Sequence, residues 1–149
     1  MSVAIRRMTA ADAEAVAEQA GQLGYPTEPA TIAERIERIA TLDARDALLV
    51  AVGDDDRPLG WTHVEIRDTL VAPHAAQLMA LVVADGARNR GVGRDLLAAA
   101  EAWAVEQGCK RLMVATRVTR EDAHRFYRRE GYELDKTSHI FEKPLPPAG

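Results

Sequence analysis

Two glycines stand among arginines between an apolar run and a run of good helix formers. In ARNRGVGRDLL, the side chains of Arg88, Arg90 and Arg94 surround Gly91 and Gly93. The first N–H groups of a helix have no partner within it, and the helix dipole places partial positive charge there. Glycines let an anion approach the backbone closely, and arginines add charge-assisted hydrogen bonds. The stretch therefore predicts an anion site at the start of a helix.

Missing motifs narrow the identity of this anion. A dinucleotide fingerprint needs a third glycine where Leu96 stands, and the Gly-Lys-Ser/Thr of a P-loop is absent. The set of kinase motifs is missing as well. Taken alone, the stretch leaves one alternative open, which is a solvated arginine-rich turn that only begins a helix.

A second stretch, TREDAHRFYRREGYE, combines a small residue with aromatic residues at helical spacing. Ala123 and Tyr127 are four residues apart, so they share one face of a helix. Phe126 precedes the tyrosine, and Gly131 and Tyr132 follow the helix. The alternative for Tyr127 is an amphipathic core residue packed beside Phe126.

Together, VVADGARNRGVGRDLL and TREDAHRFYRREGYE resemble the two signatures of the GNAT superfamily of N-acetyltransferases, over roughly residues 3–143. The resemblance implies acetyl-CoA as co-substrate, with its pyrophosphate at the glycine turn and Tyr127 as the acid that protonates the departing thiolate. It implies cofactor contacts from Val82, Val83, Arg88, Asn89, Arg90, Gly91, Val92, Gly93, Arg94, Arg120, Ala123 and Phe126.

Two positions depart from the superfamily pattern. Arg120 stands where many members have asparagine, but Arg-x-Asp-Ala-His-x-Phe-Tyr is similar to acetyltransferases of small amines, such as the aminoalkylphosphonate and aminoglycoside types. This version implies a small-molecule amine as substrate. Met79 stands where many members carry a glutamate on the central strand, so the resemblance leaves the general base unassigned.

The strand-like stretch WTHVEI supplies candidates for that base. Alternation places Trp61, His63 and Glu65 on one strand face. An imidazole accepts protons near neutral pH, and Glu65 could act through a water molecule. His74 is a third candidate, and the alternative for all of them is an ordinary polar strand face. The histidines show no metal-ligand spacing, so we predict no metal site.

Other functions stay open at this level. One is a non-catalytic acyl-CoA sensor or regulatory module that keeps the cofactor site without the chemistry. Another is an acetyltransferase of protein N-termini or lysines. A homodimer is implied only by the resemblance.

Composition bounds the remaining possibilities. The 149 residues carry a net charge of −4 and 47% hydrophobic residues, which predicts one domain over residues 1–149 with a short, flexible, proline-rich C-terminal end. The acidic balance argues against nucleic acid as a partner. Because no apolar run reaches bilayer length and no signal peptide is recognisable, we expect no membrane partner and a cytoplasmic location.

The patterning predicts an α/β fold. The resemblance implies a GNAT-like single domain, in which a mixed, mostly antiparallel, splayed sheet is flanked by about four helices. Strands are expected over residues 3–8, 46–53, 59–68, 77–85, 110–116 and 139–145. Helices are expected over residues 10–24, 27–42, 92–108 and 119–131.

Overall fold

The computed structural model describes residues 3–41 and 45–149, and the chain forms two compact units, Met1–Ala115 and Thr116–Gly149. The first unit contains a five-stranded sheet with three α-helices, and the second contains one α-helix. The single-domain organisation expected for residues 1–149 stays a prediction. In the described part of the chain, no helix is both long and apolar enough to cross a membrane.

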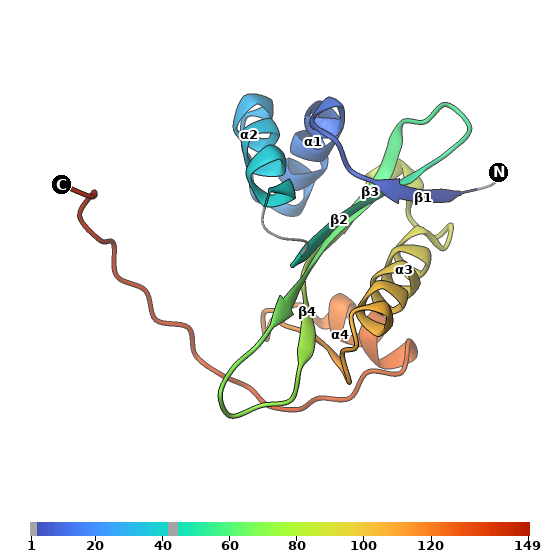
Figure 1. The fold of residues 1–149 in the computed structure, drawn as a ribbon. Helices are drawn as coiled ribbons and strands as arrows, with labels where there is room; N and C mark the ends of the chain where they lie inside the picture. Colours follow the sequence, from blue (N-terminus) through green and yellow to red (C-terminus); the bar gives the residue numbers. More distant parts are fainter. Residues whose placement is uncertain (1–2, 42–44) are drawn as a thin grey trace. The chain divides into compact units, whose positions relative to one another are not determined.

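Figure 1 shows the elements in chain order. They are β1 (Ala4–Arg7), the 3₁₀ turn η1 (Ala10–Asp12), α1 (Ala13–Leu23), α2 (Pro29–Ala40), β2 (Asp46–Val52), β3 (Pro58–Arg67), β4 (Ala75–Val83), the 3₁₀ turn η2 (Asp85–Ala87), α3 (Val92–Glu106), β5 (Leu112–Val114) and α4 (Glu121–Arg129).

The sheet has the order β1-β2-β3-β4-β5. Neighbouring strands are antiparallel except for β4 and β5, which are parallel. This arrangement confirms the predicted fold class, a mixed and mostly antiparallel sheet with four α-helices. Only Ala76, Gln77 and Leu78 of β4 pair with β5, although β4 continues to Val83. β5 therefore pairs with only the first part of β4, up to Leu78.

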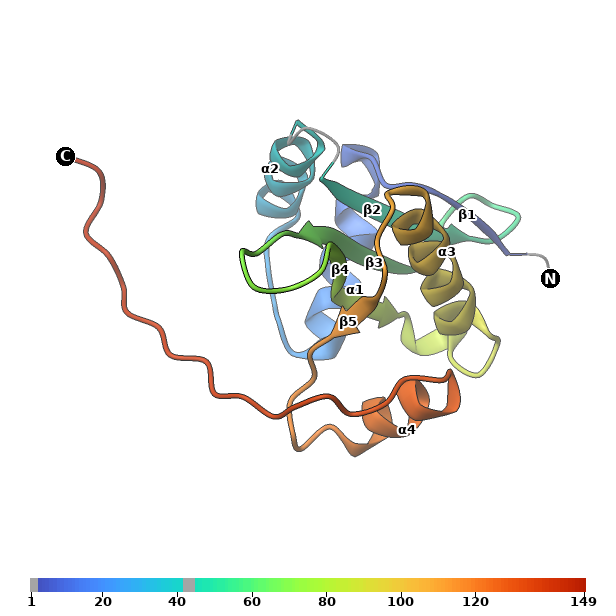
Figure 2. The same cartoon turned by 60° about the horizontal axis from the view of Figure 1, so that its bottom comes forward.

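Helices cover both faces of the sheet in the first unit (Figures 1 and 2). On one face, Val50 and Val52 of β2 pack with Val16 of α1 and Ile36 of α2. On the other face, Ala51 packs with Val92 and Leu96 of α3. Because side chains of a strand alternate between faces, β2 contributes to both apolar layers.

Local signals explain where the first helix begins and ends. The backbone N–H of Thr9 donates to the Asp12 carboxylate at 2.8 Å, so a capping pair forms around the η1 turn that precedes α1. Gly24 ends α1 in the left-handed region, at φ 103°. The predicted helix over residues 27–42 is observed as α2; its last position, 42, lies outside the described residues.

One predicted element is wrong. Residues 139–145 form no strand, and residues 131–149 contain no helix or strand. A strand is stable only in a ladder, and in the described chain this segment has no strand beside it. Its end is also poor in donors, because Pro144, Pro146 and Pro147 lack a backbone N–H. His139, expected on this strand, stacks instead on the Phe141 ring.

Gly60 of β3 stands where the structure leaves no room for a side chain. A Cβ atom there would lie 2.7 Å from the Val82 carbonyl oxygen, 3.1 Å from Val92 Cγ1 and 3.2 Å from Leu96 Cδ1. We expect Gly60→Ala to lower the free energy of unfolding by about 1–3 kcal/mol, because β4 and α3 must shift to admit the methyl group. Denaturant unfolding of the variant measures this.

Gly21→Ala is the matched control. Gly21 lies in α1, where an added Cβ meets nothing within 4 Å. An alanine in a helix interior should raise the free energy of unfolding by about 0.5–1 kcal/mol. Equal effects of the two substitutions would contradict the close approach at Gly60.

Candidate functional site

The predicted anion site is a turn of left-handed backbone between β4 and α3. Asn89 has φ 64° and Gly91 has φ 78°, and Gly91 is the N-cap residue of α3. The Asp95 N–H donates to the Gly91 carbonyl at 3.0 Å, which closes the first helical turn. Val92 is 1% exposed and anchors the start of α3 on the sheet. Sequence and fold therefore agree on where the helix begins.

The first turn of α3 has the properties of an anion site. In the part of the chain that the structure describes, no side chain caps its N-terminal N–H groups. Arg88 pairs with Asp85 at 3.1 Å on the surface, and both side chains are more than half exposed. Arg90 is exposed and forms no ion pair within residues 3–41 and 45–149. Such arginines can turn toward an anion at little cost.

The free part of β4 lies directly before this turn. The Ala84 N–H donates to Leu59 at 2.8 Å, so the backbone of residue 84 faces β3. Backbone direction alternates along a strand, so the groups of Val82 also face β3 and those of Val83 face the opposite edge. That edge has no β5 partner beyond Leu78. Of the two predicted cofactor contacts, Val82 and Val83, it is therefore Val83 whose N–H is better placed to donate a hydrogen bond to a cofactor.

The second predicted motif lies on α4 in the second unit. Ala123 and Tyr127 share a helix face, as expected from their spacing. The Tyr127 ring makes edge-to-face contacts with Phe126 (centroids 5.1 Å apart) and with Tyr132 (5.8 Å). Arg120 precedes the helix and pairs with Asp122 at 3.4 Å.

Burial raises the pKa of Tyr127 to about 12, against a smaller, lowering effect of the Arg120 charge. The phenol is therefore protonated throughout the physiological range, so it has a hydrogen to donate there. This state is the one required of an acid or a hydrogen-bond donor, and it excludes a tyrosinate base at neutral pH.

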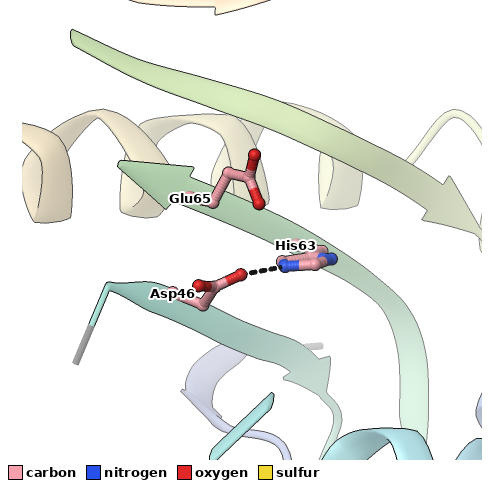
Figure 3. Close-up of side chains that lie close together, drawn as sticks. All are labelled: Asp46, His63 and Glu65. Carbon is pink, nitrogen blue, oxygen red and sulfur yellow. Dashed lines mark hydrogen bonds and ion pairs between the residues drawn. The ribbon is translucent and has the colours of Figure 1, made fainter. Parts of the chain in front are cut away.

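Two of the predicted base candidates, His63 and Glu65, lie next to Asp46, a residue that was not predicted from the sequence. His63 and Glu65 lie on one face of β3, and Asp46 of β2 lies beside them (Figure 3). His63 Nε2 is 2.6 Å from an Asp46 carboxylate oxygen. Glu65 pairs with Arg67 at 3.4 Å. An acidic residue that opens the apolar run DALLVAV was the signal that could have identified Asp46.

These three residues offer ligand atoms that lie within 4.8 Å of one another. Two ligands of one zinc-like ion, each at about 2.1 Å in tetrahedral geometry, stand roughly 3.4 Å apart. His63 and Asp46 are closer than that because they are hydrogen-bonded to each other. The observed geometry is that of a hydrogen-bonded pair, and the absence of a metal site stays a prediction.

The third base candidate, His74, has both ring nitrogens engaged. Nδ1 lies 2.5 Å from Asp68, and Nε2 lies 3.1 Å from the Gln107 carbonyl oxygen. Both partners are acceptors, so the doubly protonated ring fits best. The hydrogen bond that His74 donates to Asp68 is the main cause that raises the pKa of His74. Because acceptors engage both ring nitrogens, neither presents a free lone pair to a substrate.

Comparison with known proteins supplies the family. The model of the acetyltransferase (GNAT) family matches residues 13–132. The chain is 32% identical over 149 residues to an aminoglycoside N(6')-acetyltransferase type 1 of Stenotrophomonas maltophilia, covering 97% of this chain and 95% of that protein. It is 43% identical over 70 residues to the aminoalkylphosphonate N-acetyltransferase of Salmonella typhimurium, covering 46% and 44% of the two chains.

A solved structure agrees in fold. The aminoglycoside acetyltransferase AAC(6')-Iy, in complex with the bisubstrate analogue CoA-S-monomethyl-acetylneamine, superposes with a TM-score of 0.84 at 21% identity. The match covers 97% of this chain and 100% of that one. With the family model spanning most of the sequence and a relative matched along nearly its whole length, this chain belongs to the GNAT family and is an N-acetyltransferase.

Proposed function

We propose that the protein transfers the acetyl group of acetyl-CoA to the primary amine of a small molecule. The observation that carries the proposal is the uncapped start of α3 behind a left-handed glycine turn, combined with the Ala123/Tyr127 face of α4. The names of two relatives, an aminoglycoside and an aminoalkylphosphonate N-acetyltransferase, support a small amine as acceptor.

The glycine turn would hold the pyrophosphate of acetyl-CoA. Backbone N–H groups at the start of α3 suit phosphate oxygens, and Gly91 and Gly93 leave room for close approach. Arg88, Arg90 and Arg94 supply positive charge beside Asn89 and Val92. We assign the pantetheine portion to Val82 and Val83 of β4. The cofactor contacts that the resemblance implies for Arg120, Ala123 and Phe126 of the second unit stay predictions.

The chemistry begins with an amine that is protonated in water and attacks only when neutral. His63 accepts the proton directly, or Glu65 accepts it through a water molecule. The nitrogen then attacks the thioester carbon, and the oxygen gains negative charge. The Val83 N–H, on the unpaired edge of β4, is positioned to stabilise that oxyanion.

Tyr127 assists the departure of the thiolate. With a pKa of about 12, its phenol is a weaker acid than a thiol, whose ordinary value is about 8.5. Complete donation is therefore favourable only if Tyr127 regains a proton from the nitrogen of the tetrahedral intermediate. Its main contribution is a hydrogen bond to sulfur during C–S cleavage, so a modest catalytic effect follows.

The relatives are named N-acetyltransferases, which favours the enzyme over the non-catalytic acyl-CoA sensor that the sequence left open. Met79 is 43% exposed at the position where the resemblance would place a glutamate, so the enzyme needs a base elsewhere. The sensor and the enzyme share cofactor binding and differ in turnover. Release of CoA in the presence of a suitable amine identifies the enzyme.

Cofactor binding should stabilise the protein against heat. At 100 times its Kd, acetyl-CoA should add about 2.7 kcal/mol, which raises the Tm by roughly 5–10 °C for a chain of this size. Thermal melting measures the shift, with ATP as the control anion. A folded sample that shows no shift at saturating acetyl-CoA would rule out the assignment of the glycine turn.

The arginines should account for part of that shift. Arg90→Gln removes a cation from the turn and should reduce the Tm shift at a fixed acetyl-CoA concentration, because a charge-assisted contact is lost. Arg38→Gln, at an exposed position in the last turn of α2, is the matched control and should keep the full shift. Similar losses in the two variants would point to a non-specific charge effect.

Tyr127→Phe should lower kcat by about 10²–10⁴-fold at most and leave the acetyl-CoA Tm shift intact. The phenol acts on the leaving group, and the ring itself is retained. Steady-state kinetics with thiol detection measures kcat. Tyr132→Phe is the control, because the superfamily signature accepts Phe or Tyr at that position. An unchanged kcat in Tyr127→Phe would remove this residue from the mechanism.

A further inference from the structure

We propose that Asp46 is a positioning residue that presents His63 to the substrate amine as the general base. The inference rests on the proposed acetyltransferase function and deepens it, because it chooses between His63 and Glu65 and adds a residue. It is carried by a hydrogen bond between neighbouring strands, in a cluster that Figure 3 shows from the side of the sheet that α1 and α2 cover.

The hydrogen bond fixes the form of the imidazole. An ionised carboxylate can only accept, so at 2.6 Å the His63 Nε2 must carry a hydrogen and donate it to Asp46. In the neutral ring the other nitrogen, Nδ1, then holds the free lone pair. Within residues 3–41 and 45–149, His63 has no other hydrogen bond. Figure 3 shows the second ring nitrogen pointing away from Asp46.

The ladder between β2 and β3 holds both partners in place. Asp46 stands opposite Glu65, and Leu48 stands opposite His63, so Asp46 reaches His63 along the diagonal. The side chain of Asp46 is 9% exposed and that of His63 is 19% exposed. The low exposure keeps the pair oriented. The part of His63 that remains exposed can contact a substrate, as a general base must.

The side chains around His63 give the cluster a net negative charge. Asp46 from β2 and Glu65 from β3 are the acidic groups at His63, and Arg67 pairs with Glu65 on its outer side. From β4, the residues opposite Glu65 and His63 are the uncharged Gln77 and Ala80. The residues that α1 and α2 bury are uncharged as well. The net negative charge also attracts an ammonium substrate.

The protons balance as follows. The ammonium group of the substrate gives one proton to His63 Nδ1, and the neutral amine attacks the carbonyl carbon while the π electrons move to oxygen. When the carbonyl re-forms, the C–S bond breaks and its electron pair leaves on sulfur. The second nitrogen proton reaches that sulfur through Tyr127, and the imidazolium returns its proton to solvent. The products are the amide, free CoA thiol and one released proton.

The direct test is the tautomer of His63. In protein labelled with ¹⁵N-histidine, at a pH where the ring is neutral, His63 should show the Nε2–H form, with loss of its signals in His63→Gln as the assignment. Asp46→Asn should convert this to a mixed or reversed tautomer. An Nδ1–H tautomer in the unmodified protein, or an identical spectrum in Asp46→Asn, would overturn the inference.

The chain contains its own matched control, because Asp68 and His74 form a second carboxylate–imidazole pair in the same protein. Asp68→Asn should alter the signals of His74 alone and leave those of His63 unchanged. If Asp68→Asn also reverses the tautomer of His63, then the effect of Asp46→Asn does not come from the Asp46–His63 hydrogen bond, and the positioning role is wrong.

Kinetics tests the consequence for catalysis. Asp46→Asn should lower kcat/KM for the amine by at least about 10-fold, because the imidazole is no longer held in the Nε2–H form. The acetyl-CoA Tm shift should persist. Imidazole added to His63→Ala should restore part of kcat. Full activity in Asp46→Asn overturns this inference alone, whereas cofactor binding without turnover by the unmodified protein overturns the proposed function and the catalytic role together.

The same two measurements, kcat and the tautomer of His63, separate this role from metal binding. Zinc or manganese added to the unmodified protein should leave kcat and the His63 tautomer unchanged, because the pair is already satisfied by its own hydrogen bond. An activity that requires the metal and disappears with a chelator would show that Asp46, His63 and Glu65 act as ligands, and the positioning role would be wrong.

Discussion

The antiparallel pairing of β3 with β4 is the constraint on which the rest of the first unit depends. Gly60 permits the two backbones to approach, and the buried Thr62 hydroxyl donates to the Ala80 carbonyl at 2.7 Å. His63 stands opposite Ala80 and Val64 stands opposite Leu78, so Met79 is the extra residue of a β-bulge in β4. This register sets which backbone groups face β3 and which remain at the outer edge.

Two consequences of that register meet at the end of β4. Beyond the bulge, the strand continues without β5 and leads directly into the left-handed turn before α3. On β3, the same pairing places Trp61, His63 and Glu65 on the face that α1 and α2 cover, while Leu81 and Val83 join the layer beneath α3. Groups suited to binding an anion and groups suited to handling a proton are thus held by one pair of strands.

Much of this was predictable because it depends on local pattern. The apolar run of β2 and the alternation of β3 predicted two strands, and Gly24 and Gly108 marked the ends of α1 and α3. The helical spacing of apolar residues also indicates the inner face of α3, where Val92, Leu96, Ala100 and Trp103 are all buried. Short-range signals were sufficient wherever the partner of an element was its neighbour in sequence.

Long-range features were not predictable in the same way. The strand expected over residues 139–145 had the right composition, but no pattern in the sequence says whether a partner strand exists. The apolar run of β4 does not reveal the bulge that leaves Met79 exposed next to the buried Leu78. Asp46 was missed because its importance comes from a cross-strand diagonal, which requires the register of two strands separated by a turn.

The bulge at Met79 has a consequence for how such an enzyme can change during evolution. An inserted residue reverses the facing of everything before it relative to everything after it, so a side chain at this point serves neither apolar layer fully. A carboxylate could be gained or lost there with little disturbance of packing. Once the adjacent strand carries an oriented imidazole, proton acceptance can pass from one strand to the other. The fold would then tolerate a change of the proton-accepting residue from β4 to β3, while the glycine turn before α3 stays the same.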